Sequence, residues 1–310
     1  MPSAMTRDRR KIIKPNLILR AEIIAAIRRF FDDHDFLEVQ TPIRTPSPAP
    51  EAHIDAQPAG RWYLQTSPEL YMKRLMAAGY QRIYQICRCF RRMERGKRHL
   101  PELTLLEWYA TPGDYKKMMS QTMDLIQYVS DVVNQKQSLS YQGHPIDLTS
   151  PWDRLSVKSA FDRFGSLSME AALKTRQFDE IMGTEIEPKL GFKRPVFLFD
   201  YPAQAGALAR LKKNDPTVAE RFELYIAGLE LCNAFSELTD AKEQRKRFER
   251  ELDLRKKAGK SVYPMPEKFL EVLDQMPPTC GNALGVDRLV MLFCDTNEID
   301  KVVAFTPEEL

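Results

Sequence analysis

The chain has 310 residues, of which 43% are hydrophobic and 29% are charged, a composition that is ordinary for a soluble globular protein with a substantial core. The formal net charge is only +3, which argues against a dedicated nucleic-acid-binding protein, because such proteins usually carry a larger basic excess. No apolar run approaches the roughly 18 residues that a membrane-spanning helix needs, so we expect no membrane partner.

The basic segment 1–14 lacks the apolar centre of a secretory signal, and we expect it to be a flexible arm. Residues 15–310 are expected to form a single domain. The cysteines match neither the spacing of a zinc site nor that of a disulfide framework; they are Cys87, Cys89, Cys232, Cys280 and Cys294. This pattern favours buried, reduced thiols in a cytoplasmic protein.

Hydrophobic periodicity predicts an α+β domain in which helices and strands are mixed along the chain. We expect helices over residues 15–34, 67–78 and 114–134, mostly helical structure over 150–195, and a charged helix after Asp240. The start of that last helix, Asp-Ala-Lys-Glu, is typical of a capping box. We expect strands over residues 36–39, 82–90, 102–110, 196–199, 221–226 and 229–237.

The most informative feature is the hairpin predicted over residues 82–110. Its loop carries a dense set of cationic side chains, which are Arg91, Arg92, Arg95, Lys97, Arg98 and His99. Guanidinium groups bind phosphate oxygens two at a time and can stabilise the charge that grows during attack at phosphorus. A second motif, Gly281-x-x-x-Gly285-x-Asp287-Arg288, opens an apolar helix and makes a merely solvated charge run less plausible.

The alternation in strand 102–110 separates two faces of the sheet. Leu103, Leu105, Glu107 and Tyr109 share one face, and the residues between them share the other. Glu107 stands among apolar neighbours, so it is either a surface charge or a carboxylate that binds substrate.

Carboxylates are concentrated in the hairpin predicted over residues 221–237. If its turn centres near residues 226–227, Glu223 and Glu230 oppose one another, and two such charges repel unless a cation lies between them. Mg²⁺, which also binds phosphate oxygens, would resolve the conflict. Asn233, Phe235 and Glu237 alternate onto the other face and could seat an extended ammonium-bearing side chain. A strand with polar outward positions remains the alternative.

Together these motifs resemble motifs 2 and 3 of the class II aminoacyl-tRNA synthetases. Segment 66–75, the cationic loop, segment 230–238 and segment 281–288 are most similar to bacterial lysyl-tRNA synthetase, over about residues 15–305. The resemblance implies a six-stranded antiparallel sheet with flanking helices, and ATP and Mg²⁺ as cofactors. It also implies a homodimer, with segment 36–50 at the interface.

The resemblance implies roles for individual residues. Arg91 and Arg288 would be catalytic, and Glu223 and Glu230 would bind the metal. ATP would be bound by Arg91, Arg92, Met93, Glu94, Arg98, His99, Leu100, Leu103, Glu230, Leu231, Gly285 and Arg288. The substrate amino acid would be bound by Ser67, Pro68, Glu69, Glu107, Tyr109, Asn233, Phe235, Glu237 and Ala283.

Three positions depart from the synthetase pattern in the part of the site that binds adenine. Met93 replaces the glutamate that contacts the adenine amino group, and Leu100 replaces an asparagine. Leu103 replaces a phenylalanine that stacks on the base, and leucine covers a purine by dispersion without aromatic stacking.

Lysyl enzymes that charge tRNA carry an anticodon-binding domain before this core, whereas here the core is expected to begin near residue 15. The chain therefore resembles the truncated paralogues that ligate (R)-β-lysine or lysine to a lysine of elongation factor P, which would be the acceptor in place of tRNA. Ala283 agrees, because the tRNA enzymes carry glycine there. Two alternatives remain open: lysyl transfer to tRNA by a bare core, and a non-catalytic sensor or binding protein.

Overall fold

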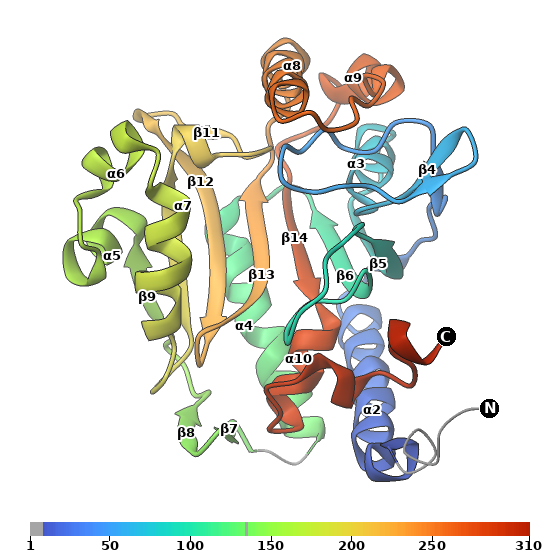
Figure 1. Cartoon of the computed structure of the whole chain (residues 1–310), viewed down its shortest axis with the longest axis vertical. Coiled ribbons are helices and arrows are strands. Elements are labelled where there is room, and N and C mark those ends of the chain that lie inside the picture. The colour runs from blue at the N-terminus through green and yellow to red at the C-terminus, as the bar shows by residue number, and fades with distance from the viewer. Residues whose placement is uncertain (1–8, 134–135) are drawn as a thin grey trace.

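A mixed, twisted sheet runs through the molecule, which is given by a computed structural model that describes residues 9–133 and 136–310 (Figure 1). Within these residues the sheet has nine strands in the order β1-β5-β6-β14-β13-β12-β10-β9, with β11 paired to β12. In that order the strands are β1 (Leu37–Glu38), β5 (Arg82–Phe90), β6 (Glu102–Ala110), β14 (Cys280–Gly285), β13 (Leu229–Ser236), β12 (Asp215–Ile226), β10 (Val196–Pro202), β9 (Asp153–Ser156) and β11 (Leu211–Lys212).

The expected six-stranded antiparallel sheet is therefore wrong as a description of the whole sheet. The six central strands, β5 to β10 in the sheet order, are paired antiparallel. Strand β1 adds to β5 in parallel, and β9 adds to β10 in parallel. These edge strands have two and four residues, too few for alternation to reveal a partner. Short strands β2 (Arg44–Thr45), β3 (Pro58–Ala59), β4 (Trp62–Leu64), β7 (Ser138–Tyr141) and β8 (His144–Asp147) form two further small sheets.

The helices follow the sequence prediction closely, and their ends are set by local chemistry. They are α2 (Lys14–Asp32), α3 (Glu69–Ala77), α4 (Tyr115–Val132), α5 (Val157–Phe164), α6 (Met169–Thr175), α7 (Phe178–Ile181), α8 (Ala241–Lys257), α9 (Glu267–Leu273) and α10 (Val286–Phe293). The Asp114 side chain accepts from the N–H groups of Lys116 and Lys117 and caps α4. Asp240 caps α8 by accepting from the N–H of Glu243. Segment 150–195 is mostly helical, as expected, apart from β9.

The two faces of the central sheet have different surroundings, as the alternation in β6 predicts: one packs in the core and the other lines a cavity. Leu106 and Trp108 are fully buried in the main core, against side chains of α2, α4 and α10 such as Phe31. Glu107 and Tyr109 point to the opposite face and line a cavity. One face of the sheet therefore stabilises the fold, and the other is left for a site.

The N-terminal and C-terminal segments of the described chain pack together. Residues 9–12 are helical, and Arg9 forms an ion pair with Glu309 at 2.5 Å and donates to the Asp300 carbonyl at 2.8 Å. The expected flexible arm thus does not extend over residues 9–14, because these contacts fix them. Residues 1–8, the rest of that prediction, lie outside the described part of the chain.

The cysteines and the absence of a membrane-spanning segment were the two features expected from composition. All five cysteines are free thiols; Cys87 and Cys294 are only half-buried, whereas the other three are buried as expected. In the part of the chain that the structure describes, no helix combines the length and the apolar character needed to cross a membrane.

Candidate active site

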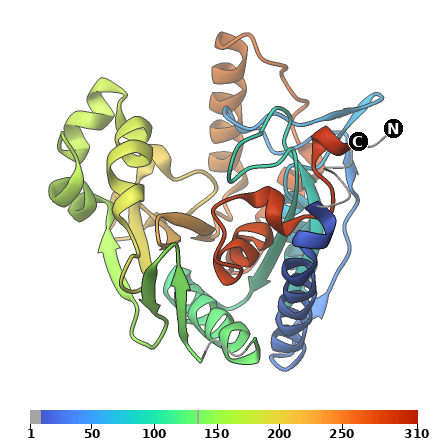
Figure 2. The same cartoon turned by 60° about the horizontal axis from the view of Figure 1, so that its bottom comes forward.

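A cavity of about 860 Å³ opens on the face of the sheet that carries Glu107. Figure 2 shows the lobe of helices α5–α7 and the helix α8 rising from the same side of the molecule, and residues from both line the cavity. Segments far apart in sequence thus converge on one space. The predicted site residues that line it are Ser67, Glu69, Arg91, Glu94, Arg98, His99, Leu100, Leu103, Glu107, Tyr109, Glu223, Glu230, Leu231, Asn233, Phe235, Glu237, Ala283, Gly285 and Arg288.

Three predicted site residues, Pro68, Arg92 and Met93, do not line this cavity. Pro68 takes the N-cap position of α3. The loop turns outward after Arg91, because the N–H of Arg92 donates to the Asp55 carbonyl at 2.6 Å and Met93 has a left-handed φ of +67°. The Met93 side chain is consequently 84% exposed. The loop geometry thus separates these two side chains from the positions expected for them.

An ammonium group of the chain itself lies between two carboxylates at one end of the cavity. Lys73 Nζ is 2.5 Å from Glu69 Oε1 and 2.5 Å from Glu237 Oε2, and its side chain is only 1% exposed. Burial alone would lower the pKa of Lys73, but the charges of Glu237 and Glu69 outweigh burial and raise it. Two carboxylates and one ammonium leave a net charge of about −1, which suits one further cationic group.

The sequence did not reveal that Lys73 takes this place, because its two partners come from elements far apart in the chain. Gly281 lies beside the same group: a Cβ there would clash with Glu237 Oε1 and with the Tyr109 ring. Strand β14 can therefore approach the pocket only because this residue has no side chain.

Glu107 is buried beneath the same end of the cavity. Its carboxylate accepts from the Ser67 hydroxyl at 2.7 Å and from the Tyr109 hydroxyl at 3.1 Å. Burial, helped by the charge of Glu69, raises the pKa of Glu107 to about 8, although the two hydrogen bonds oppose the shift. The Glu107 carboxylate can bind an ammonium group only while the carboxylate is ionised. Protonation of Glu107 would therefore compete with binding of the ammonium group.

We expect the affinity of the free protein for the amino acid that the sequence predicts as substrate to fall as the pH drops below about 8, the pKa of Glu107. The sign follows because protonation removes the charge that an ammonium group contacts. The measurement is log kcat/KM for the amino acid against pH. A limb of unit slope should appear in the native protein and disappear in Glu107→Gln, whereas an identical limb in both proteins would contradict the assignment.

The opposite end of the cavity is cationic. Arg288 donates to Glu230 Oε2 at 3.1 Å, and its other nitrogen lies 2.6 Å from His99 Nε2. Burial, with the charge of Arg288, lowers the pKa of His99. Because a guanidinium nitrogen can only donate, His99 Nε2 is the acceptor in this contact. Arg98 donates to the Gly228 carbonyl at 2.9 Å, and Arg91 Nε is buried with no hydrogen-bond partner among the described residues. These groups suit the oxygens of a polyphosphate.

The cationic loop is held in place from behind by the C-terminal segment. Arg95 forms ion pairs at 2.8 Å with both Asp300 and Glu308. These two ion pairs hold the outer side of the loop, and Arg95 does not line the cavity, so Arg95 has a positioning role rather than a phosphate contact.

The prediction that Glu223 and Glu230 oppose one another is wrong. Strand β12 places Glu223 opposite Asn233 and Tyr225 opposite Glu230. The turn is at Ala227-Gly228, both with left-handed φ, and β13 advances two residues where β12 advances one. This β-bulge at Leu231 reverses the alternation, because an extra residue moves all later side chains to the other face.

Because of the same bulge, the expectation that the polar residues of 230–237 lie on two faces of the strand is wrong. Asn233, Phe235 and Glu237 were expected on the face opposite to Glu230, but all four line one cavity. A single extra residue in the strand thus brings the predicted phosphate and amino-acid residues together.

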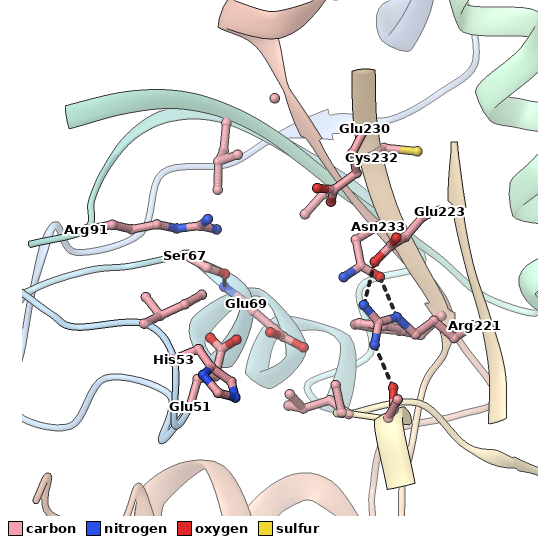
Figure 3. Close-up of a pocket in the computed structure, with 18 of the residues that line it drawn as sticks. Glu51, His53, Ser67, Glu69, Arg91, Arg221, Glu223, Glu230, Cys232 and Asn233 are labelled. Atoms are coloured by element: carbon pink, nitrogen blue, oxygen red, sulfur yellow. Dashed lines mark hydrogen bonds and ion pairs between the residues drawn. The ribbon is translucent and has the colours of Figure 1, made fainter. Parts of the chain in front are cut away.

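The acceptor groups near Glu223 limit how a metal can bind. Glu223 Oε2 accepts from the hydroxyls of Tyr201 and Tyr225 at 2.6 Å each. Its Oε1 accepts from Arg221 at 2.5 Å, a contact drawn in Figure 3. Each carboxylate oxygen has two lone pairs, so one position remains on Oε1. Among the described residues, no three His, Cys, Asp or Glu side chains converge as a metal site by themselves. These residues fit Mg²⁺ only as a few ligands to an ion held chiefly by phosphate oxygens and water.

Besides Lys73, several charged or polar residues of this cavity region were missed, and Arg221, Gln244 and Glu187 are examples. Arg221 shares its strand face with Glu223, a signal that i, i+2 spacing could have given. Gln244 lines the cavity from α8 with no partner for either side-chain amide atom. The pKa of Glu187 is raised to about 7 by burial and then by the charges of Glu223 and Glu230. Neither Gln244 nor Glu187 belongs to a sequence pattern that points to a site.

The chain is similar in sequence to known proteins over nearly its whole length. Residues 3–309 match the family model described as tRNA synthetases class II (D, K and N). A protein named elongation factor P--(R)-beta-lysine ligase from Proteus mirabilis (strain HI4320) is 40% identical over 307 residues, 94% of each chain. Proteins with the same name are 39% identical in Salmonella gallinarum, over 310 residues, and in Pectobacterium atrosepticum, over 311 residues; each match covers 94% of this chain and 95% of the relative.

Proposed function

Because the chain belongs to the family of class II tRNA synthetases (D, K and N), we propose that it is an ATP-dependent ligase of the kind its relatives' name describes. It activates (R)-β-lysine, or lysine, as an aminoacyl-adenylate and transfers the acyl group to the ε-amine of a lysine on elongation factor P. The observation that carries the proposal is the pairing of these relatives, similar over nearly their whole length, with a cavity that has an anionic and a cationic end.

The anionic end supports a diamino substrate. Glu107 offers a carboxylate to the amine nearest the carbonyl, and Glu69 and Glu237 offer a net negative charge, after pairing with Lys73, to a distant ammonium. A monoamino acid would leave one of these buried groups unpaired, which costs about 1–3 kcal/mol or more for a charged group. Selection of two ammonium groups in one molecule follows from that cost.

Ala283 lies where its side chain can make the pocket distinguish a substrate with its amine on the α-carbon from one with its amine on the β-carbon. Its position in β14 pairs with Glu107 of β6 on one side and with Asn233 of β13 on the other. Its methyl group therefore narrows the pocket beside the carboxylate that receives the amine. One methyl group changes discrimination by about 1–3 kcal/mol, enough to favour one amine position.

The cationic end supports adenylate formation. Arg91 reaches into the cavity, where its charge can stabilise the α-phosphate as the substrate carboxylate attacks. Glu230 and His99 hold Arg288 in place for the distal phosphates. Mg²⁺, bound through Glu230 and the remaining position of Glu223 Oε1, would neutralise phosphate charge. Leu100 and Leu103 line the cavity and would cover the adenine by dispersion.

We also propose that the protein forms a homodimer through segment 36–50. Leu37 and Ile43 in this segment are large apolar residues, and they are 51% and 49% exposed in the single chain. A second copy of the protein that packs on this segment would cover them. The molar mass in solution tests this, and a monomer at micromolar concentration would contradict it.

The activation step is tested by pyrophosphate exchange with purified protein, using (R)-β-lysine, lysine and a monoamino acid. We expect exchange with the diamino acids only, and its loss when Mg²⁺ is chelated. If nucleotide binds and no amino acid supports exchange, the protein is a sensor rather than a ligase.

A further inference from the structure

The loop of residues 50–54 is fixed against the cavity by contacts from α8 and the segment that follows it. Arg255 donates to the carbonyls of Glu51 and Ile54, both at 2.8 Å, and Glu251 accepts from the N–H of Ala52 at 2.9 Å. Lys260 adds a bond to the Ala52 carbonyl at 3.0 Å. Because these bonds hold the backbone, the side chains of this loop have defined positions.

Glu51 extends from this fixed loop into the cavity. Figure 3 shows it beside His53, below Ser67 and Glu69. No described residue donates a hydrogen bond to its carboxylate. The charged groups that act on its pKa are Arg91 from the cationic loop, Glu69 from α3, Glu251 from α8 and Arg221 from β12. Burial is the largest influence and raises the pKa of Glu51 to about 7, with Arg91 opposing it.

The proposed transfer has a chemical need that adenylate formation does not have. The acceptor is a lysine side chain with a pKa of about 10.4, so it is almost entirely an ammonium ion at neutral pH. An ammonium nitrogen has no lone pair and cannot attack a carbonyl. A base must take its proton close to the acyl-phosphate, and a hydroxyl acceptor on tRNA would not carry this extra proton.

Resting on the proposed function, we propose that Glu51 is the general base that deprotonates the acceptor ammonium. One proton passes from the lysine nitrogen to the Glu51 carboxylate, and the freed lone pair forms the C–N bond. The C–O bond between the acyl carbon and the phosphate breaks, and AMP leaves with that electron pair. The second proton on nitrogen is lost to a phosphate oxygen of the departing AMP and then to water. Glu51 returns its proton to solvent once the product has left.

The four other carboxylates that the proposed function assigns to the amino acid or to Arg288 already have partners. Glu69 and Glu237 contact Lys73, and Glu107 accepts two hydroxyl hydrogen bonds. Glu230 binds Arg288. Glu51 has none of these contacts, and it lines the same cavity as Arg91, the residue expected to hold the α-phosphate. A base whose pKa lies near the working pH is also the most effective one.

The experiment separates activation from transfer in Glu51→Gln. Pyrophosphate exchange with (R)-β-lysine measures activation. Trapping of the adenylate by hydroxylamine, which is unprotonated at neutral pH, measures reactivity toward an amine that needs no base. Single-turnover transfer to elongation factor P measures the complete reaction. Glu249→Gln, an exposed glutamate on α8 outside the cavity, is the matched control, and His53→Gln tests the neighbouring side chain.

We expect Glu51→Gln to keep exchange and hydroxamate formation close to those of the native protein and to lose about 10²–10⁴-fold in transfer to protein. That loss should shrink as the pH rises toward the pKa of the acceptor amine. Equal transfer by Glu51→Gln and the native protein would overturn the proposal, as would the same loss in His53→Gln alone. A parallel loss in exchange would also overturn it, since Glu51 would then act in activation. If the native protein forms the adenylate but never modifies elongation factor P, the proposed function itself fails.

Discussion

Replacing Arg91 with alanine is expected to lower kcat for adenylate formation by about 10²–10³-fold, the usual loss when one electrostatic contact to the transition state is removed. The guanidinium reaches into the cavity with Nε unpartnered, so it is available for a contact that strengthens as charge grows on phosphorus. Amino-acid affinity should change far less, because that contact is made mainly in the transition state.

Single-turnover adenylate formation and amino-acid binding, measured on the same preparations, check this expectation. Arg88→Ala is the matched control, because Arg88 is an arginine of the adjoining strand whose side chain pairs with Glu102 outside the cavity. Equal losses in binding and in the chemical step of Arg91→Ala would show that Arg91 only binds substrate.

Replacing Lys73 with methionine is expected to lower the free energy of unfolding by about 3–5 kcal/mol, the typical cost of removing one partner from a buried ion pair. Methionine fills a similar volume but leaves Glu69 and Glu237 facing one another without a cation. One of the two carboxylates must then be protonated, so this end of the cavity keeps a charge of about −1 without the Lys73 ammonium.

Urea unfolding at pH 7 measures the effect. The double variant Lys73→Met with Glu237→Gln should be more stable than Lys73→Met alone, because the second change removes one of the two repelling charges. If Lys73→Met is as stable as the native protein, the buried triad contributes nothing to the fold. If adding Glu237→Gln destabilises it further, carboxylate repulsion is not the cause.

Strong periodic segments could be predicted from the sequence, and positions set by three-dimensional context could not. The observed bounds of β5 and β6 agree with the expected strands, since both have long alternating patterns ended by the loop. The helix after Asp114 was equally clear because an apolar stripe and a cap agree. Of the two parallel edge strands, β1 lies within the strand expected over residues 36–39, whereas β9 was missed inside a segment expected to be mostly helical.

Much of the candidate site was predicted for the same reason, through motifs that lie on these regular elements. The bulge in β13 was invisible, because one extra strand residue leaves no mark on composition, yet it moves Glu230 to the face of Asn233. Lys73 and Glu51 were missed because their importance comes from partners and walls contributed by distant elements. Met93 was misplaced because a left-handed turn redirects its side chain.

The most direct test of this account is the fate of the activated amino acid. Purified protein is incubated with ATP, Mg²⁺, (R)-β-lysine and a mixture of elongation factor P and tRNA, and both acceptors are then analysed by mass. We predict that elongation factor P gains one lysyl group on a single lysine side chain and that tRNA stays unacylated. Acylated tRNA together with unmodified elongation factor P would contradict the account.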